Sequence, residues 1–91
     1  MPEATVVLRN PTGLHARPAK IFARAAASFA ADVELVKGGK EVNAKSVLSV
    51  LTLDCHQGDE IRIRTTGDGA DEALARLVEL VETGIGEPEE S

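Results

Sequence analysis

The segment DVELVKGGKEVN, residues 32–43, decides the fold because it predicts an antiparallel pair of strands. Residues 32–37 alternate as a strand, with Val33 and Leu35 on one face. Gly38-Gly39 is a two-residue turn of the kind that joins the strands of a hairpin, and residues 40–43 return as a short partner. The chain is therefore expected to contain an antiparallel sheet with one apolar face.

Two further strands are predicted outside this hairpin. Residues 5–9 are rich in β-branched side chains, which favour extended backbone. Residues 60–66 alternate strictly, so that two isoleucines are buried while Arg62 and Arg64 face water. Because every strand alternates in this way, only one face of the sheet needs to be covered.

Helical periodicity predicts two long helices. One is expected over about residues 16–29, with the Phe22 and Phe29 side chains in the core. The other covers about residues 70–83, with Asp68 as its N-terminal cap. Both have an apolar stripe that would pack on the sheet.

Residues 46–53 begin with Ser46, a good N-cap, and favour a short helix, although so brief an apolar run is also compatible with a strand. The helical interpretation gives the order βαββαβα. This is an α+β sandwich with a four-stranded antiparallel sheet and three helices on one face. We expect residues 1–91 to form one domain, with residues 87–91 as a disordered acidic tail.

The composition limits the classes of function. A formal net charge of −5 argues against nucleic acid as the main partner, and 91 residues leave little room for a deep substrate pocket. No signal peptide precedes the first strand, and no apolar run approaches the ~20 residues that span a bilayer. The single cysteine, Cys55, cannot form an internal disulfide. We therefore expect a cytoplasmic protein without membrane insertion.

His15 lies at the expected start of the first long helix, within GLHARPA, residues 13–19. Backbone N–H groups at a helix start have no intrahelical acceptor and the helix dipole is positive there, so the position suits an anion. Arg17 adds a planar fork of donors, and its charge favours the neutral imidazole, which has a nucleophilic lone pair. A capping or solvated histidine is the alternative interpretation.

The sequence around His15 is basic. No acidic residue occurs between Glu3 and Asp32, whereas several Lys and Arg residues do. Without a nearby carboxylate we expect neither a Mg²⁺ ligand nor a general base for water, so a phosphohistidine would persist. Cys55-His56 lacks a second pair at metal-ligand spacing, and no metal or other cofactor is expected.

The motif GLHARPA, together with Gly39-Lys40 and VNAKS (residues 42–46), resembles the HPr family, the histidine phosphocarriers of the bacterial phosphoenolpyruvate-dependent sugar phosphotransferase system. The resemblance covers residues 5 to about 82 and implies the family's open-faced βαββαβα sandwich. It also implies that His15 takes phosphate from phosphorylated enzyme I and delivers it to sugar-permease A domains, with Arg17 as the stabiliser. Such a chain is a phosphocarrier rather than a free-standing enzyme, and we expect it to be a monomer.

The resemblance implies a second, regulatory site at Ser46. This residue matches a serine that an ATP-dependent kinase modifies in HPr of many Gram-positive bacteria, although a plain N-cap is the simpler interpretation. A serine kinase or phosphatase and a transcription regulator would then be further partners. The side chains expected to contact partners are Lys20, Arg24, Lys45, Val47, Leu48 and Leu51.

Two other functions stay open. One is a carrier for a dedicated regulatory or dihydroxyacetone-kinase phosphorelay. It would use the same His15 and Arg17, so only the identity of the partners separates it from a sugar-transport carrier. The other is a binding module whose serine-phosphorylated form docks on a transcription factor.

Overall fold

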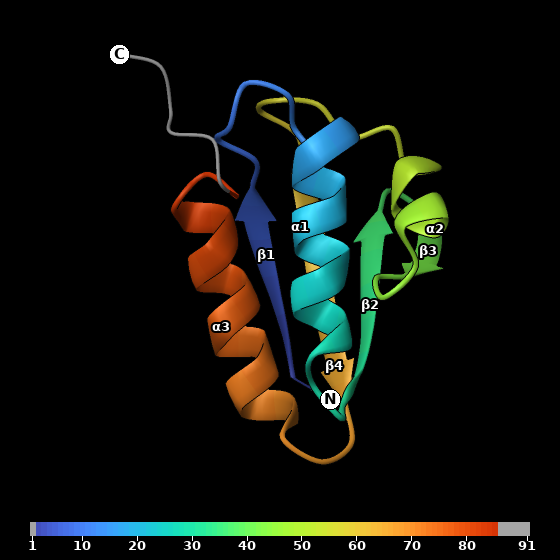
Figure 1. The fold of residues 1–91 in the computed structure, drawn as a ribbon, viewed down its shortest axis with the longest axis vertical. Coiled ribbons are helices and arrows are strands. Elements are labelled where there is room, and N and C mark those ends of the chain that lie inside the picture. The colour runs from blue at the N-terminus through green and yellow to red at the C-terminus, as the bar shows by residue number, and fades with distance from the viewer. Residues whose placement is uncertain (1, 86–91) are drawn as a thin grey trace.

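The computed structural model describes residues 2–85 and has the element order βαββαβα that the sequence predicts (Figure 1). Its elements are β1 (Glu3–Val7), α1 (Ala16–Ala27), β2 (Asp32–Lys37), β3 (Lys40–Asn43), α2 (Val47–Leu51), β4 (Glu60–Thr66) and α3 (Ala70–Glu82). The predicted tail, residues 87–91, lies outside the described residues. No helix within residues 2–85 is long and apolar enough to cross a membrane.

The four strands form one antiparallel sheet in the order β1-β4-β2-β3. Ile63 of β4 lies at its centre, opposite Ala4 of β1 on one side and Leu35 of β2 on the other. The helices cover one face of this sheet, and α1 and α3 run antiparallel across it (Figure 1). The structure is therefore an open-faced α+β sandwich.

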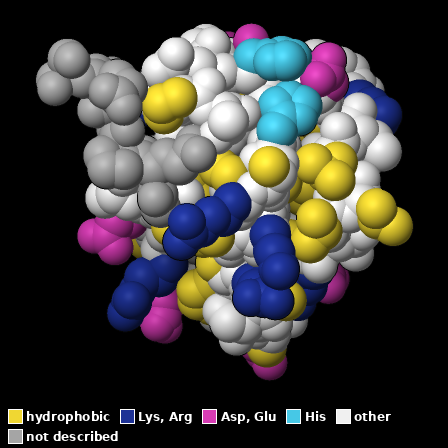
Figure 2. Space-filling model, turned by 45° about the horizontal axis from the view of Figure 1, so that its top comes forward, with side chains coloured by type: hydrophobic (Ala, Val, Ile, Leu, Met, Phe, Trp, Pro, Cys, Tyr) yellow, Lys and Arg dark blue, Asp and Glu magenta, His cyan; other side chains and the backbone are white. Residues whose placement is uncertain are grey.

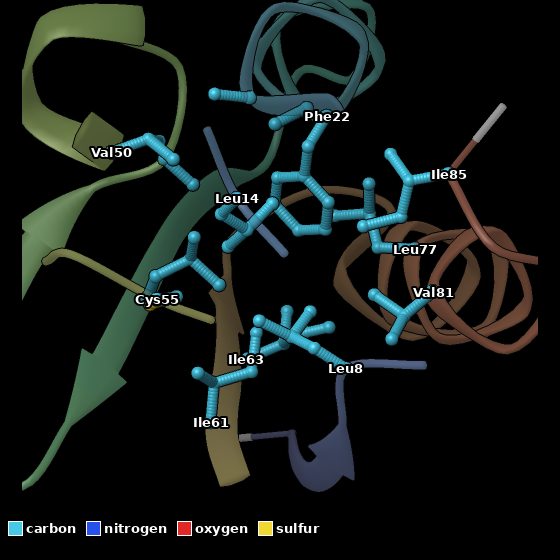
Figure 3. Packing of buried hydrophobic residues seen from close by; sticks show 14 of the residues in the cluster. Leu8, Leu14, Phe22, Val50, Cys55, Ile61, Ile63, Leu77, Val81 and Ile85 are labelled. Carbon is cyan, nitrogen blue, oxygen red and sulfur yellow. The ribbon is translucent and has the colours of Figure 1, made fainter. Parts of the chain in front are cut away.

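The core lies between the sheet and the helices, where the inward residues of the strands meet the apolar stripes of α1 and α3. Phe22 is fully buried, as predicted, whereas Phe29 is only partly buried at the end of α1. Figure 3 shows Phe22 directed between Leu14 on one side and the α3 side chains Leu77 and Val81 on the other. This packing holds the middle of α1 against the sheet and α3.

The opposite face of the sheet is polar. Arg64 of β4 lies within 3.7 Å of Glu3 and within 3.5 Å of both Glu34 and Glu41, so each of the other three strands places a carboxylate near this guanidinium. With 18% of its side chain exposed, Arg64 is more covered than the sequence pattern indicates. The alternation nevertheless holds, because Ile61 and Ile63 are buried on the helix side.

Two local predictions are wrong. Strand β1 spans residues 3–7 rather than 5–9, because its pairing with β4 ends where Val7 lies opposite Glu60. Asp68 does not cap α3: the N-cap is Gly69, whose left-handed backbone (φ 76°) turns the chain into the helix without a side-chain cap. The ambiguous run after Ser46 is helical in residues 47–51.

Candidate functional site

His15 is the N-cap of α1, with an extended backbone (φ −122°, ψ 156°). The loop before it is shaped by Asn10, a buried side chain whose Nδ2 donates to the carbonyl of Gly13 at 2.8 Å. The first turn of α1 carries no acidic residue. The backbone N–H groups of the first turn, which have no intrahelical acceptor, therefore follow directly after His15 in the chain.

A second loop is held against this one. The backbone N–H of Leu14 donates to the carbonyl of Cys55 at 3.0 Å. The approach is so close that a Cβ on Gly13 would lie 2.4 Å from the same carbonyl oxygen. Gly13 also has a left-handed backbone (φ 63°), so both its conformation and its surroundings require glycine. This contact brings residues 54–56 to the side of His15.

Asp54 and His56 form a cluster with His15. The Asp54 Oδ1 atom lies 3.3 Å from Nε2 of His15 and 3.1 Å from Nε2 of His56, and the two imidazole centroids are 4.9 Å apart. Figure 2 shows the two histidine side chains side by side on one face. The prediction that no carboxylate lies near His15 is wrong, because the chain folds Asp54 back onto it from a distant part of the sequence.

The His15–Asp54 contact is electrostatic. The Nε2 atom of His15 is buried from solvent, and its approach to the carboxylate does not meet the geometry of a hydrogen bond. The Asp54 side chain is 72% exposed and the His15 side chain 33% exposed. The cluster is thus open to solvent on the carboxylate side and covered around Nε2 of His15.

Asp59 and Lys37 brace the loop that carries Asp54 and His56. Asp59 Oδ2 accepts a hydrogen bond from the backbone N–H of His56 at 2.8 Å and pairs with Lys37 Nζ at 3.1 Å. The His56 N–H and then Lys37 hold the pKa of Asp59 below its usual range, and the bond to Asp59 raises the pKa of Lys37. Lys37 also donates to the carbonyl of Asp54 at 2.8 Å.

The predicted basic residues of α1 lie on the surface below the histidines. Arg17, Lys20 and Arg24 are exposed, and together with Ala16 and Ile21 they line a shallow hollow. Among residues 2–85 these three form no ion pair with an acidic side chain. Figure 2 shows Lys and Arg side chains gathered on the face that carries the histidines. Arg17 lies two residues after His15, in the first turn of α1.

The second predicted site lies at the start of α2. Ser46 is the N-cap, and its Oγ accepts a hydrogen bond from the backbone N–H of Ser49 at 3.3 Å. Leu48 is 77% exposed and Leu51 36% exposed, whereas Val47 is half-buried. The Nζ of Lys45, the third basic residue predicted to contact partners, donates to the carbonyl of Phe29 at 2.9 Å. Its ammonium thus ties α2 to the end of α1.

Cys55 lies between Asp54 and His56 but points away from them. Its side chain is fully buried and directed into the core, near Leu14 and Ile61 (Figure 3). Burial raises the pKa of the thiol to about 11. Sequence reasoning identified His15 but missed Asp54 and His56, and no pattern within the sequence places these two segments together.

Comparison with known proteins agrees with this architecture. The family described as PTS HPr component phosphorylation site matches residues 2–83. Phosphocarrier protein HPr of Streptomyces coelicolor is 44% identical over 88 residues, which cover 96% of this chain and 95% of that protein. The crystal structure of HPr-C-His from Thermoanaerobacter tengcongensis superposes with a TM-score of 0.92 at 40% identity, covering 96% of this chain and 98% of the other.

A third similar protein is much longer than this chain. DhaM of Klebsiella michiganensis, the phosphoryl donor subunit of a PEP-dependent dihydroxyacetone kinase, is 40% identical over 87 residues. These residues are 96% of this chain but 18% of DhaM, so the similarity concerns one segment of a much longer protein. The match along nearly the whole chain, the shared fold and the histidine at the start of α1 together show that this chain belongs to the HPr family of phosphocarrier proteins.

Proposed function

We propose that the chain accepts a phosphoryl group on His15 from phosphorylated enzyme I and transfers it to the A domains of sugar permeases. The observation that carries this proposal is the position of the His15 ring at the start of α1, with Nε2 buried against Asp54. Because Nε2 is covered, Nδ1 is the ring nitrogen left to react. The family membership supports the same role.

The nucleophile in this proposal is Nδ1 of His15. The negative charge of Asp54 at 3.3 Å from Nε2 favours the tautomer with the proton on Nε2, which leaves the lone pair on Nδ1. This lone pair attacks the phosphorus, the bond from phosphorus to the donor breaks, and a phosphorus–Nδ1 bond forms. Backbone N–H groups at the start of α1 and the Arg17 guanidinium then stabilise the phosphoryl oxygens.

The test is to incubate the protein with phosphoenolpyruvate and enzyme I and to measure an acid-labile phosphoryl adduct by mass spectrometry. We expect one adduct on the wild-type protein, none on His15→Ala, and one on His56→Ala, which removes the only other histidine of the chain. Arg17→Ala should slow formation of the adduct without abolishing it. No adduct on the wild-type protein, or an adduct that survives His15→Ala, contradicts the proposal.

Docking of partners is assigned to the surface around this site. The exposed Arg17, Lys20 and Arg24 provide positive charge for acidic partner surfaces, and Leu48 and Leu51 provide apolar area beside Val47. Lys45 contributes less in this proposal, because its ammonium is bound to Phe29. The cytoplasmic location and the monomeric state expected from the sequence belong to the same proposal.

Ser46 is proposed as a regulatory phosphorylation site. Its half-buried hydroxyl lies at the start of α2, two residues before exposed Leu48, so a phosphate there would place about two negative charges within the proposed docking surface. A serine kinase or phosphatase and a transcription regulator would be partners of this second form. Incubation with ATP and cell extract should give an acid-stable adduct, and its formation on Ser46→Ala would show that the modified residue lies elsewhere.

A second candidate function is a dihydroxyacetone-kinase phosphorelay, which the 40% identity to DhaM favours. It uses the same His15 chemistry and differs only in the acceptor. The discriminating experiment offers the phosphorylated protein either a sugar-permease A domain or the dihydroxyacetone kinase subunits. The acceptor that removes the phosphoryl group faster identifies the relay.

A further inference from the structure

We propose that His15, Asp54 and His56 form a binding site for a divalent transition-metal ion such as Zn²⁺, and that the bound ion prevents His15 from accepting a phosphoryl group. The site is defined by one potential ligand atom from each of the three residues, and these atoms all lie within 4.8 Å of one another. The regulatory part of this inference rests on the proposed function of His15. The binding part does not.

The distances fit tetrahedral coordination. Zn²⁺ binds imidazole nitrogen and carboxylate oxygen at about 2.0–2.2 Å, which places neighbouring ligand atoms roughly 3.4 Å apart. The two distances from Asp54 Oδ1, 3.3 Å to His15 and 3.1 Å to His56, are already close to this value. The remaining distance, between a ligand nitrogen of each imidazole, is at most 4.8 Å. It can shorten because the His56 side chain is 61% exposed and has room to rotate inward.

The donor set selects the kind of ion. Two neutral imidazoles and one carboxylate suit zinc and other late first-row metals, whereas Mg²⁺ and Ca²⁺ prefer all-oxygen ligands. Three protein ligands leave the fourth position to water. Cys55 is not part of the set, because its side chain is fully buried in the core although its neighbours in sequence are ligands.

The backbone already places the ligands. Asp54 has a left-handed backbone (φ 53°), which directs the chain so that Asp54 and His56 both face His15. Asp59 holds the His56 backbone N–H and Lys37 holds the Asp54 carbonyl, so the loop is braced on both sides of the site. A braced loop reduces the ordering that metal binding requires.

The chemical consequence for His15 follows from its two nitrogens. A metal on Nε2 replaces the proton there, and the neutral ring then carries its proton on Nδ1. Nδ1 becomes an N–H donor without a lone pair, so it cannot attack phosphorus. The ion also changes the charge of the cluster from negative to positive. This adds repulsion between the cluster and the basic side chains of α1, but it does not by itself block docking.

The binding test uses tag-free protein, ZnCl₂ and isothermal titration calorimetry, with the histidine ring protons followed by NMR. We expect one Zn²⁺ per wild-type chain and simultaneous shifts of both histidines. Asp54→Asn and His56→Ala should each weaken binding by about 10-fold or more, since even loss of an outer-shell partner costs 10–100-fold. Asp68→Asn, which removes an exposed carboxylate elsewhere, is the matched control and should bind as the wild type does.

The regulatory test compares the rate of His15 phosphorylation by enzyme I with and without Zn²⁺. Zn²⁺ should lower the rate of the wild-type protein at least 10-fold more than it lowers the rate of His56→Ala. Any effect of Zn²⁺ on enzyme I itself is common to both proteins and cancels in this comparison. Equal binding by the wild type and both ligand variants, or equal inhibition of both proteins, overturns the inference. Failure of phosphorylation without metal instead contradicts the proposed function alone.

Discussion

Asp54 Oδ1 lies 3.3 Å from Nε2 of His15, and the backbone hydrogen bond nearest to this pair joins the adjoining residues of the two loops. That bond, from the Leu14 N–H to the Cys55 carbonyl, is 3.0 Å long. The electrostatic environment of His15 is thus set by a loop–loop contact rather than by α1 alone. Changes that separate the loops should alter the site without touching the imidazole.

Gly13→Ala should separate the loop before α1 from the loop that carries Asp54 and His56. The new Cβ would lie 2.4 Å from the Cys55 carbonyl oxygen, so the backbone must move. Gly38→Ala is the matched control, because Gly38 has nearly the same φ (61° against 63°) and nothing within 4 Å of its Cβ position. We expect Gly38→Ala to lower the free energy of unfolding by about 1–2 kcal/mol and Gly13→Ala by about 1–3 kcal/mol more. If urea denaturation shows the same loss in free energy of unfolding for both variants, Gly13 is not in close contact with the Cys55 carbonyl.

The hairpin and the central strand could be predicted from the sequence at their observed bounds, residues 32–37, 40–43 and 60–66, because alternation and turn residues are local signals. The bounds of β1 could not, since they depend on where its partner begins. Leu8 looks like a strand residue, but its N–H and C=O bond to the loop at Asp59 and Gly58 instead of to β4.

The site also contains residues that could be predicted from the sequence and residues that could not. His15 and Ser46 could be identified because each lies in a local motif at the start of a helix. Asp54 and His56 could not be placed beside His15, because a contact between two loops leaves no periodicity in the sequence. Packing of Cys55 and Leu14 in one core is what aligns the loops, and that is a property of the folded sheet and helices together.

Lowering the pH should weaken the contacts of Asp59 with the His56 N–H and Lys37. The folded pKa of Asp59 is lowered by the His56 N–H and Lys37, so its contribution to stability is present above the unfolded pKa of about 3.9 and is lost as pH falls through the folded value. Asp59→Asn should therefore be less stable than the wild type at pH 7, with a difference that shrinks below about pH 4. Urea denaturation across this range measures the difference, and Asp68→Asn is the exposed-carboxylate control. A difference independent of pH would contradict the role of the Asp59 charge.

The Cys55 thiol should be protected from alkylation. Burial raises its pKa from 9.0 to about 11, so at pH 8 the thiolate fraction in the folded protein is about 100-fold lower than in the unfolded protein. Iodoacetamide, used with a chelator present, should react at least ~100-fold more slowly with native protein than with urea-unfolded protein. Mass spectrometry of the iodoacetamide adduct over time measures the rate for the folded and the unfolded protein.

The same shift in the pKa of Cys55 lowers the free energy of unfolding between about pH 9 and pH 11, because only the unfolded thiol ionises there.

Ser46→Ala should lower the free energy of unfolding by about 1 kcal/mol, because the Ser49 N–H loses its side-chain acceptor. Ser46→Asp keeps an acceptor at the N-cap and should cost only a few tenths of that amount. Chemical denaturation of the three proteins gives the comparison. If the two variants are equally destabilised, the Ser46 hydroxyl does not act as a cap.

Leu48→Ser should slow phosphoryl transfer from enzyme I without lowering stability. Leu48 is 77% exposed, so its removal takes almost no apolar area out of the core, but it does remove the most exposed apolar side chain of the proposed docking surface. Val7→Ser is the matched control, since Val7 is also exposed (45%) but follows buried Val6 in β1 and so faces the side of the sheet opposite to the helices. Truncation of a side chain that carries binding energy costs about 1–3 kcal/mol, which corresponds to a rate reduction of roughly 5- to 150-fold at low concentrations of enzyme I. Thermal unfolding of both variants and the initial rate of His15 phosphorylation separate the two effects. A rate loss shared by Val7→Ser, or none in Leu48→Ser, would place the docking surface elsewhere.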